Sequence, residues 1–396
     1  MVVLFIIAAP PVVLYSWRHR NIIRLGVIDA VLLLLVGFVT LRGLSAAPGR
    51  ADMGLVIALV AYMLLLYYGM SFLAQDGRST MAFIYILSAL AMVIAGYAVL
   101  EFFIGKNIIY GSIVAEKVPV KAASASYHRS GSTLGSPVAL GLFLVQVAPL
   151  LLFCYFRSPI GRRRIAWGLA VLLSAAALLL TFTKGSWVTA LFLTSVMLVF
   201  LTWRRRHMSR DLKSGLFVLV AVSLAATLIF GIISFRDLKY NLTSKQREIE
   251  SYSIRWLLWK GTPALIAAHP IDGVGVWQAQ DRLYEILVSE GKDHPNKPLP
   301  IDNLYLTTLA EEGFIGLSLG AVTVLLIGRQ VWRLIRLDKE HFQVVIPFAV
   351  SMLAVLVNGF TVDSLLVWPT MVVFWLSAGI IRSQAELMRV GVGSHN

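Results

Sequence analysis

Two residues in the second half of the chain have side chains suited to chemistry on a charged substrate. Arg255 lies at the start of an aromatic amphipathic stretch and precedes the turn His269-Pro-Ile-Asp-Gly-Val-Gly275. A planar guanidinium donates paired hydrogen bonds to phosphate oxygens, so Arg255 is suited to holding a diphosphate, although a solvated helix face explains it as well. Asp302 lies in Pro300-Ile-Asp-Asn-Leu-Tyr305, directly before an apolar run. It is either a helix N-cap or a general base at the membrane surface.

Two further cations lie beside short turns. Arg129 belongs to the segment 127–137, in which several hydroxyls precede an apolar run. The N-terminal amides of such a helix could bind an anion, and the alternative is a capped Gly/Ser turn. Lys184 lies in Thr181-Phe-Thr-Lys-Gly-Ser-Trp187, a turn between two apolar runs. A lysine in this position is either an interfacial anchor or part of a site, and the flanking Gly and Trp favour the site.

Several classes of chemistry are excluded by what the sequence lacks. The one cysteine, Cys154, lies in an apolar run and can build neither a disulfide framework nor a cysteine metal site. No two of the histidines expected on the outer side, His128, His269 and His294, have metal-ligand spacing, so no metal site is predicted. The chain has no P-loop and no dinucleotide fingerprint, and we expect no cofactor. A reaction would then need an already activated substrate, such as a lipid-linked diphosphate sugar.

The elements that must position these residues are membrane-spanning helices. The 396 residues are 58% hydrophobic and 14% charged, whereas soluble proteins carry about 25% charged residues. Apolar runs approaching the length of a span predict an all-α, polytopic transmembrane helical bundle of about 11–12 spans. The runs lie near 2–16, 26–42, 54–74, 80–103, 136–156, 165–182, 186–202, 215–234, 313–334, 343–361 and 365–382.

Basic clusters orient the predicted bundle in the membrane. The formal net charge is +14, but membrane proteins collect Lys and Arg in cytoplasmic loops, so we expect no nucleic-acid partner. Clusters within 157–164, 204–213 and 329–339 fall on one side when the spans alternate, which predicts cytoplasmic loops and a cytoplasmic C-terminal tail. The outward segments are then 105–135, the turn around Lys184, 235–312 and the turn at Asp363.

The chain is expected to divide into three parts. Residues 1–234 hold transmembrane helices 1–8, residues 235–312 form a large extracytoplasmic loop, and residues 313–396 hold transmembrane helices 9–11 and the cytoplasmic tail. The loop is too long for a passive connector and should be ordered in part. Amphipathic stretches over Tyr252–Ala268 and Asp281–Glu290 predict two helices within it.

Charged residues inside the predicted spans are few and lie toward span ends or turns, as Asp29, Glu101 and Lys184 do. Ion-coupled transporters usually keep ionisable residues near mid-membrane to bind the coupling ion. The distribution of charge therefore favours chemistry at the outer surface over transport.

The motifs, in this order, resemble those of the O-antigen ligase and polymerase family of bacterial envelope glycosyltransferases. Thr183-Lys-Gly-Ser-Trp187 is similar to the family's basic-Gly-x-Trp element, with a Lys where Arg is more usual. Ser253-Ile-Arg-Trp256, continuing into 269–275, resembles its Arg-containing loop helix and Pro-x-x-Gly-x-Gly turn. Asp302-Asn-Leu-Tyr-Leu306 with Glu312-Gly-Phe-Ile-Gly-Leu317 resembles its Asn-x-Tyr-Leu and Glu-Gly-x-x-Gly segment, so Asn303 and Tyr305 become supporting residues.

The resemblance implies a metal-independent glycosyltransferase in the bacterial inner membrane, with its active site facing the periplasm. It would pass a glycan from an undecaprenyl-diphosphate donor to a hydroxyl of a glycan or lipid-linked acceptor. Arg255, Lys184 and Arg129 would hold the diphosphate and stabilise the charge that develops as it leaves. In the ligase branch the base is typically a His directly before the Asn, whereas here Asp302 stands there, which favours the polymerase or exopolysaccharide branch over transfer to lipopolysaccharide core. His294 is the alternative base.

Two other functions stay open at this point. A lipid or polysaccharide transporter or flippase would use the long loop as a gate, and substitution of Asp302 would then matter little. A peptidoglycan-type polymerase would also use an outward acidic residue on a lipid-linked diphosphate, and its acceptor would distinguish it.

Overall fold

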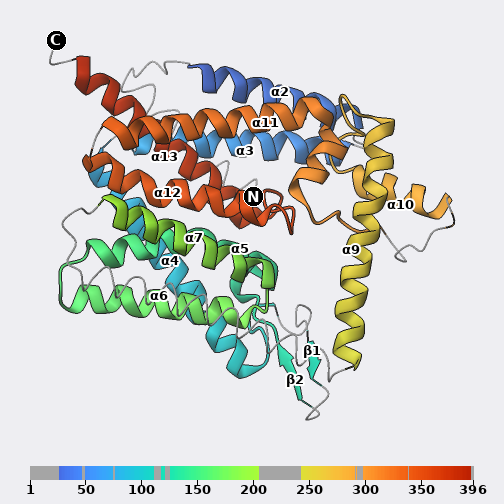
Figure 1. Ribbon diagram of the computed structural model, residues 1–396, viewed down its shortest axis with the longest axis horizontal. Coiled ribbons are helices and arrows are strands. Elements are labelled where there is room, and N and C mark those ends of the chain that lie inside the picture. Colours follow the sequence, from blue (N-terminus) through green and yellow to red (C-terminus); the bar gives the residue numbers. More distant parts are fainter. Residues whose placement is uncertain are drawn as a thin grey trace.

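The chain folds as a bundle of long helices with a smaller helical region across one end (Figure 1). The computed structural model describes residues 26–46, 50–74, 76–110, 117–120, 125–204, 242–289, 291, 298–337 and 339–393. The helices of the bundle are α2 (Val27–Ala46), α3 (Arg50–Leu73), α4 (Gly77–Ile104), α5 (Pro137–Arg157), α6 (Arg162–Leu180), α7 (Lys184–Arg204), α11 (Leu304–Leu337), α12 (Lys339–Asn358) and α13 (Trp368–Gly393).

This architecture confirms the prediction of an all-α polytopic membrane protein. Within the described ranges, six helices are long and apolar enough to cross a membrane, namely α2, α3, α4, α5, α6 and α11. Residues Val344–Asn358 of α12 form a shorter apolar helix. The predicted spans 2–16 and 215–234 lie outside the described residues.

Burial separates the helices at the centre of the bundle from those at its periphery. In α5, 78% of the apolar window is buried, against 22% in both α2 and α6. A helix that is apolar all round but mostly uncovered by protein has a surface suited to lipid. Helix α5 is therefore the central element, and α2 and α6 present much of their surface to the bilayer.

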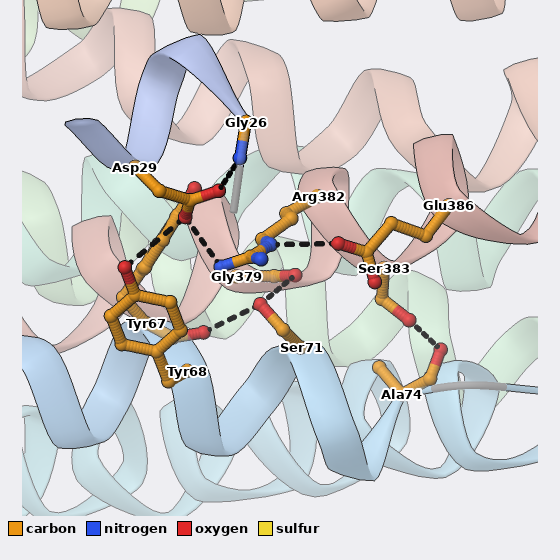
Figure 2. A network of polar contacts seen from close by, with 10 residues as sticks. All are labelled: Gly26, Asp29, Tyr67, Tyr68, Ser71, Ala74, Gly379, Arg382, Ser383 and Glu386. Carbon is orange, nitrogen blue, oxygen red and sulfur yellow. Dashed lines mark hydrogen bonds and ion pairs between the residues drawn. The ribbon is translucent and has the colours of Figure 1, made fainter. Parts of the chain in front are cut away.

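One charged network lies inside the bundle (Figure 2). Arg382 of α13 pairs through Nη1 with Asp29 of α2 at 2.6 Å and through Nε with Glu386 at 3.0 Å. The Arg382 and Asp29 side chains are only 4% and 5% exposed. The guanidinium also lies over the rings of Tyr67 and Tyr68 of α3, at 5.4 Å and 4.9 Å from their centroids. The network joins α2, α3 and α13.

Asp29 lies in the first turn of α2, as expected for a charge near a span end, whereas Arg382 lies within α13. The last predicted span ended at residue 382, whereas α13 continues to Gly393 and buries Arg382 among other helices. Hydrogen bonds from the Ser71 hydroxyl to the Gly379 carbonyl, 3.2 Å, and from the Ser383 hydroxyl to the Ala74 carbonyl, 2.8 Å, continue the contact between α3 and α13 (Figure 2).

The smaller region contains α9 (Leu242–Ala268) and α10 (Ala279–Ser289), and α9 runs across the ends of the bundle helices (Figure 1). We call this side the loop end of the bundle. Both helices were predicted, and α9 begins ten residues earlier than expected. Their shared core with α11 consists of Leu258, Leu265, Ala279, Leu283, Leu287, Ile301 and Ala310. A hairpin of β1 (Lys117–Val120) and β2 (Ala125–His128) was not predicted.

Candidate functional site

The site is centred on an ion pair between two segments at the loop end. Arg255 of α9 donates from Nε to Oδ2 of Asp302 at 3.1 Å, and Asp302 lies two residues before α11. The two side chains are 38% and 27% exposed. This contact uses one of the five N–H groups of the guanidinium. A pair that is partly open to solvent in this way can accept an anionic ligand at the guanidinium.

Asn303, and not Asp302, caps helix α11. Its Oδ1 accepts hydrogen bonds from the backbone amides of Tyr305 and Leu306, both at 3.1 Å, which is the geometry of an N-cap. Asp302 stands one residue earlier with φ of 55°, a left-handed conformation that is uncommon for a non-glycine residue. The interpretation of Asp302 as the N-cap is therefore wrong, and its carboxylate faces Arg255 instead.

The turn that follows α12 holds this segment in place. The Leu304 amide donates to the Gly359 carbonyl at 2.8 Å, and the Asn303 side chain donates to the Phe360 carbonyl at 3.3 Å. The Tyr305 hydroxyl donates to the Leu356 carbonyl at 2.6 Å. Asp302 is thus anchored to the bundle through the residues that follow it.

Asp363, from the predicted outward turn, is a second carboxylate at the site and was not among the predicted site residues. Its side chain is buried and accepts from the Thr307 hydroxyl at 2.8 Å and from the backbone amides of Asp302 and Asn303. These hydrogen bonds support the strained backbone of Asp302. The available signal was an acidic residue in an expected outward turn, but no spacing connected it to position 302.

Burial and neighbouring charges shift the pKa values of both carboxylates. Burial raises the pKa of Asp302 above its ordinary value, and the charge and hydrogen bond of Arg255 oppose that rise. Burial raises the pKa of Asp363 to about 6, the hydrogen bond from Thr307 lowers it, and the charge of Asp302 raises it further. The site therefore holds two acidic groups of which Asp302 has a cation beside it.

Arg129 and Lys184 lie on chain segments that pack together near the same α12 turn. Arg129 donates from Nε to the Thr181 carbonyl at 3.0 Å, and Lys184 is the first residue of α7. A Cβ at Gly185 would lie 2.7 Å from the Thr361 hydroxyl, so the Lys184 turn packs closely on residues 358–361. Both cations thus lie on segments linked to the Asp302 segment through that turn.

The amides of the Arg129 segment already have a protein acceptor. The buried Glu101 carboxylate accepts from the Ser132 amide at 2.6 Å and from the Gly131 amide at 3.4 Å. Ser136 caps α5 by accepting from the Ala139 amide at 3.4 Å. The capped-turn interpretation describes these amides, and the Arg129 side chain remains the candidate for an anion contact.

The turn 270–275 and the break in α11 at Gly313 fit together through backbone contacts. A Cβ at Gly273 would lie 2.3 Å from the Glu311 carbonyl, and a Cβ at Gly313 would lie 2.3 Å from the Ile271 carbonyl oxygen. Only glycine allows this approach, which is the physical reason for the two Gly-containing motifs. The hydrogen bonds run from Val274 to Ala310, Gly275 to Glu311, Phe314 to Pro270 and Ile315 to Ile271.

The structure brings two of the predicted site residues into contact and places the others that it describes on the same or neighbouring segments. Arg255 and Asp302 touch, Asn303 and Tyr305 hold the segment, and Arg129 and Lys184 lie on adjoining turns. His294 lies outside the described residues and stays a prediction.

These observations define a multi-pass helical membrane protein whose charged site lies at one end of its bundle. Residues 169–321 match the family model described as O-antigen ligase. This segment is therefore similar to the O-antigen ligase family, and the match supports the resemblance found in the motifs. The matched segment contains Lys184, Arg255 and Asp302, whereas Arg129 and Asp363 lie outside it. A comparison with curated proteins gives no match.

The family and the apolar helices together indicate a glycan-transferring membrane enzyme of the ligase kind. A lipid-linked glycan and an acceptor within a membrane are the substrates that the family implies. The same findings indicate a multi-pass protein of the bacterial inner membrane.

Proposed function

We propose that this protein transfers a glycan from an undecaprenyl-diphosphate donor to an acceptor hydroxyl at the outer face of the inner membrane. The observation that carries the proposal is the partly exposed pair of Arg255 and Asp302, 3.1 Å apart at the loop end. One partner can bind the leaving diphosphate and the other can accept a proton from the incoming hydroxyl. A general base and a group that stabilises the leaving charge each speed a transfer of this kind.

Binding of the diphosphate is assigned to the three cations Arg255, Lys184 and Arg129. Arg255 retains N–H groups beyond the one that contacts Asp302, and a guanidinium matches phosphate oxygens in pairs. Lys184 and Arg129 lie on the adjoining turns and would contribute charge to the same anion. Their task is to stabilise the negative charge that grows on the diphosphate as the glycosidic bond breaks.

The base is assigned to Asp302. Because the three cations take up the charge of the diphosphate, the reaction is proposed to need no metal. The acceptor hydroxyl attacks the anomeric carbon as its proton passes to the Asp302 carboxylate. The bond between that carbon and the diphosphate oxygen breaks, and undecaprenyl diphosphate leaves with the electron pair. Attack from the face opposite the leaving group inverts the anomeric configuration.

Within this family we favour the polymerase or exopolysaccharide branch over the ligase that acts on lipopolysaccharide core. The support is Asp302, which directly precedes Asn303, at the place where ligases typically carry a His. A carboxylate and an imidazole can both serve as base, so the choice of acceptor has to be measured.

The test is reconstitution of the purified protein with an undecaprenyl-diphosphate oligosaccharide and a series of acceptors, with release of undecaprenyl diphosphate as the readout. We expect release by the wild type and its loss in Arg255→Ala and Asp302→Ala, with folding verified by thermal unfolding. Lys260→Ala is the matched control, because Lys260 is an exposed cation on the same helix.

The alternatives predict other results in the same assay. A transporter or flippase would move the lipid across the vesicle membrane without breaking the diphosphate bond, and Asp302→Ala would have little effect. A peptidoglycan-type polymerase would release undecaprenyl diphosphate only when a peptidoglycan precursor is supplied.

A further inference from the structure

The end of α2 that lies at the loop end carries an arginine that holds the large loop. Arg42 pairs through Nη1 with Oδ2 of Asp272 at 2.9 Å, and its Nη2 donates to the Gly273 carbonyl. Through these two contacts α2 holds the turn that contains Gly273, although Arg42 and Gly273 are 231 residues apart in the sequence. The Arg42 and Asp272 side chains are 24% and 48% exposed, so this is a partly buried, charge-assisted dock.

The turn gripped by Arg42 is connected to both halves of the candidate site. It directly follows α9, the helix that carries Arg255, and it is hydrogen bonded to residues 310–315 around the break at Gly313. Asp302 stands at the start of the short helical segment that ends at this break.

The two partners of the site are nevertheless attached to the bundle in different ways. Asp302 is held by the α12 turn, through the hydrogen bond between Leu304 and Gly359. Arg255 is carried by α9, which is joined locally to the Asp302 segment by a hydrogen bond from Trp259 Nε1 to the Ile301 carbonyl, 2.8 Å. The dock at Arg42 ties the far end of the same helix to α2.

We propose that Arg42 is a positioning residue of the transfer reaction: by docking the turn 270–275 onto α2, it sets the place of Arg255 relative to Asp302. The inference rests on the proposed function. It assigns a role in the reaction to a residue that lies outside the segment matched by the family. A misplacement of about 1 Å at a reacting group is enough to slow an enzyme by two orders of magnitude, so a distant dock can control the rate.

The first test measures docking without reference to activity. Hydrogen exchange of the amides in 270–275 and 310–315 should become faster in Arg42→Ala and return toward the wild-type rate in the charge swap Arg42→Asp with Asp272→Arg. Arg282→Ala is the matched control, because Arg282 makes a surface ion pair with Glu285 in the same loop, with side chains 59% and 64% exposed. It should leave these amides unchanged.

The second test measures the reaction. Arg42→Ala should lower kcat about tenfold while the donor KM changes less, because geometry at the reacting atoms is lost. The part of the acidic limb that is set by Asp302 should move to higher pH, because Arg255 opposes the rise in the pKa of Asp302 and would lie farther away. Asp363, the other charged group beside Asp302, is unchanged in the variant. The charge swap should restore both quantities in part, because it re-forms the ion pair but an aspartate at position 42 cannot donate to the Gly273 carbonyl.

Three results would overturn the proposal, and they can be told apart. Faster exchange in Arg42→Ala with an unchanged kcat and pH profile would make the dock purely structural. Unchanged exchange would show that Arg42 does not hold the turn. No transfer by the wild type would overturn the proposed function itself, and with it the role of Arg42 in transfer. If Arg42→Ala fails to fold, Arg42→Lys and the charge swap give the same readouts.

Discussion

Two arginine–aspartate pairs in this protein have the same chemistry and opposite surroundings. Arg382 and Asp29 lie 2.6 Å apart inside the bundle, 4% and 5% exposed, with Glu386 and two tyrosine rings around the guanidinium. Arg255 and Asp302 lie 3.1 Å apart at the loop end, 38% and 27% exposed. The first pair is enclosed by side chains from three helices, whereas the second is open on one side.

The difference shows how position decides what an ion pair can do. A buried pair stabilises the fold only if every charge is paired inside the protein, and it has no exposed surface for a ligand. A partly exposed pair gains little stability, but its guanidinium and carboxylate remain accessible to a substrate. We therefore assign the inner pair to the assembly of the bundle and the outer pair to chemistry.

The largest effect is expected from the carboxylate of the outer pair. Asp302→Asn keeps the shape and removes the base, so the rate of undecaprenyl diphosphate release should fall by about 10²–10⁴-fold. Asp281→Asn, an exposed aspartate of α10, should retain wild-type release and is the control. Release by Asp302→Asn within threefold of the wild type would remove the contrast between the two pairs.

Substitutions in the inner pair should lower the free energy of unfolding and leave the transfer rate unchanged. Arg382→Ala leaves Asp29 buried without its partner and should lower the free energy of unfolding by about 3–5 kcal/mol. The double variant Arg382→Met with Asp29→Leu should recover much of this loss, because apolar side chains replace a buried pair at little cost. Thermal unfolding in detergent measures both, and transfer per folded molecule should stay near that of the wild type. A selective loss of transfer would contradict the assignment.

The cation of the outer pair should affect the leaving group. Arg255→Ala should lower kcat by about 10²–10³-fold, the usual cost of losing one group that stabilises transition-state charge. Arg255→Lys should recover only part of the rate, because an ammonium cannot form the paired hydrogen bonds of a guanidinium. Steady-state kinetics with Lys260→Ala as control provide the measurement. Equal rates for Arg255→Lys and the wild type would show that charge alone is sufficient.

The smallest effect on the transfer rate is expected from a change of pH, through Asp363. Burial is the main cause that raises the pKa of Asp363 to about 6, so this carboxylate becomes protonated as the pH falls through that value. Protonation weakens an acceptor of the Asp302 and Asn303 amides, and the rate should fall up to about tenfold between pH 7 and pH 5. Asp363→Asn should be slower at neutral pH and should lose this part of the profile. Retention of the limb near pH 6 in that variant would assign it to another group.

The sequence by itself located several of the bundle helices and proposed both members of the pair at the candidate site. Apolar run length is a local property, so the windows near 80–103 and 136–156 correspond closely to α4 and α5. Arg255 and Asp302 were recognised because each lies in a motif with its own chemistry. The sequence could not decide between Asp302 and Asn303 as the N-cap, because both residue types cap helices and only the backbone conformation distinguishes them.

Only the tertiary structure decided which charges meet. Arg382 finds Asp29 across 353 residues, and Arg42 finds the turn at Gly273 across 231 residues. Asp363 meets the backbone of Asp302 through the turn after α12. No local pattern encodes such pairs, because the positions of partners far apart in the chain depend on how whole helices pack. Helix formation follows from neighbouring residues, whereas the enclosure of one ion pair and the exposure of the other follow from the assembled bundle.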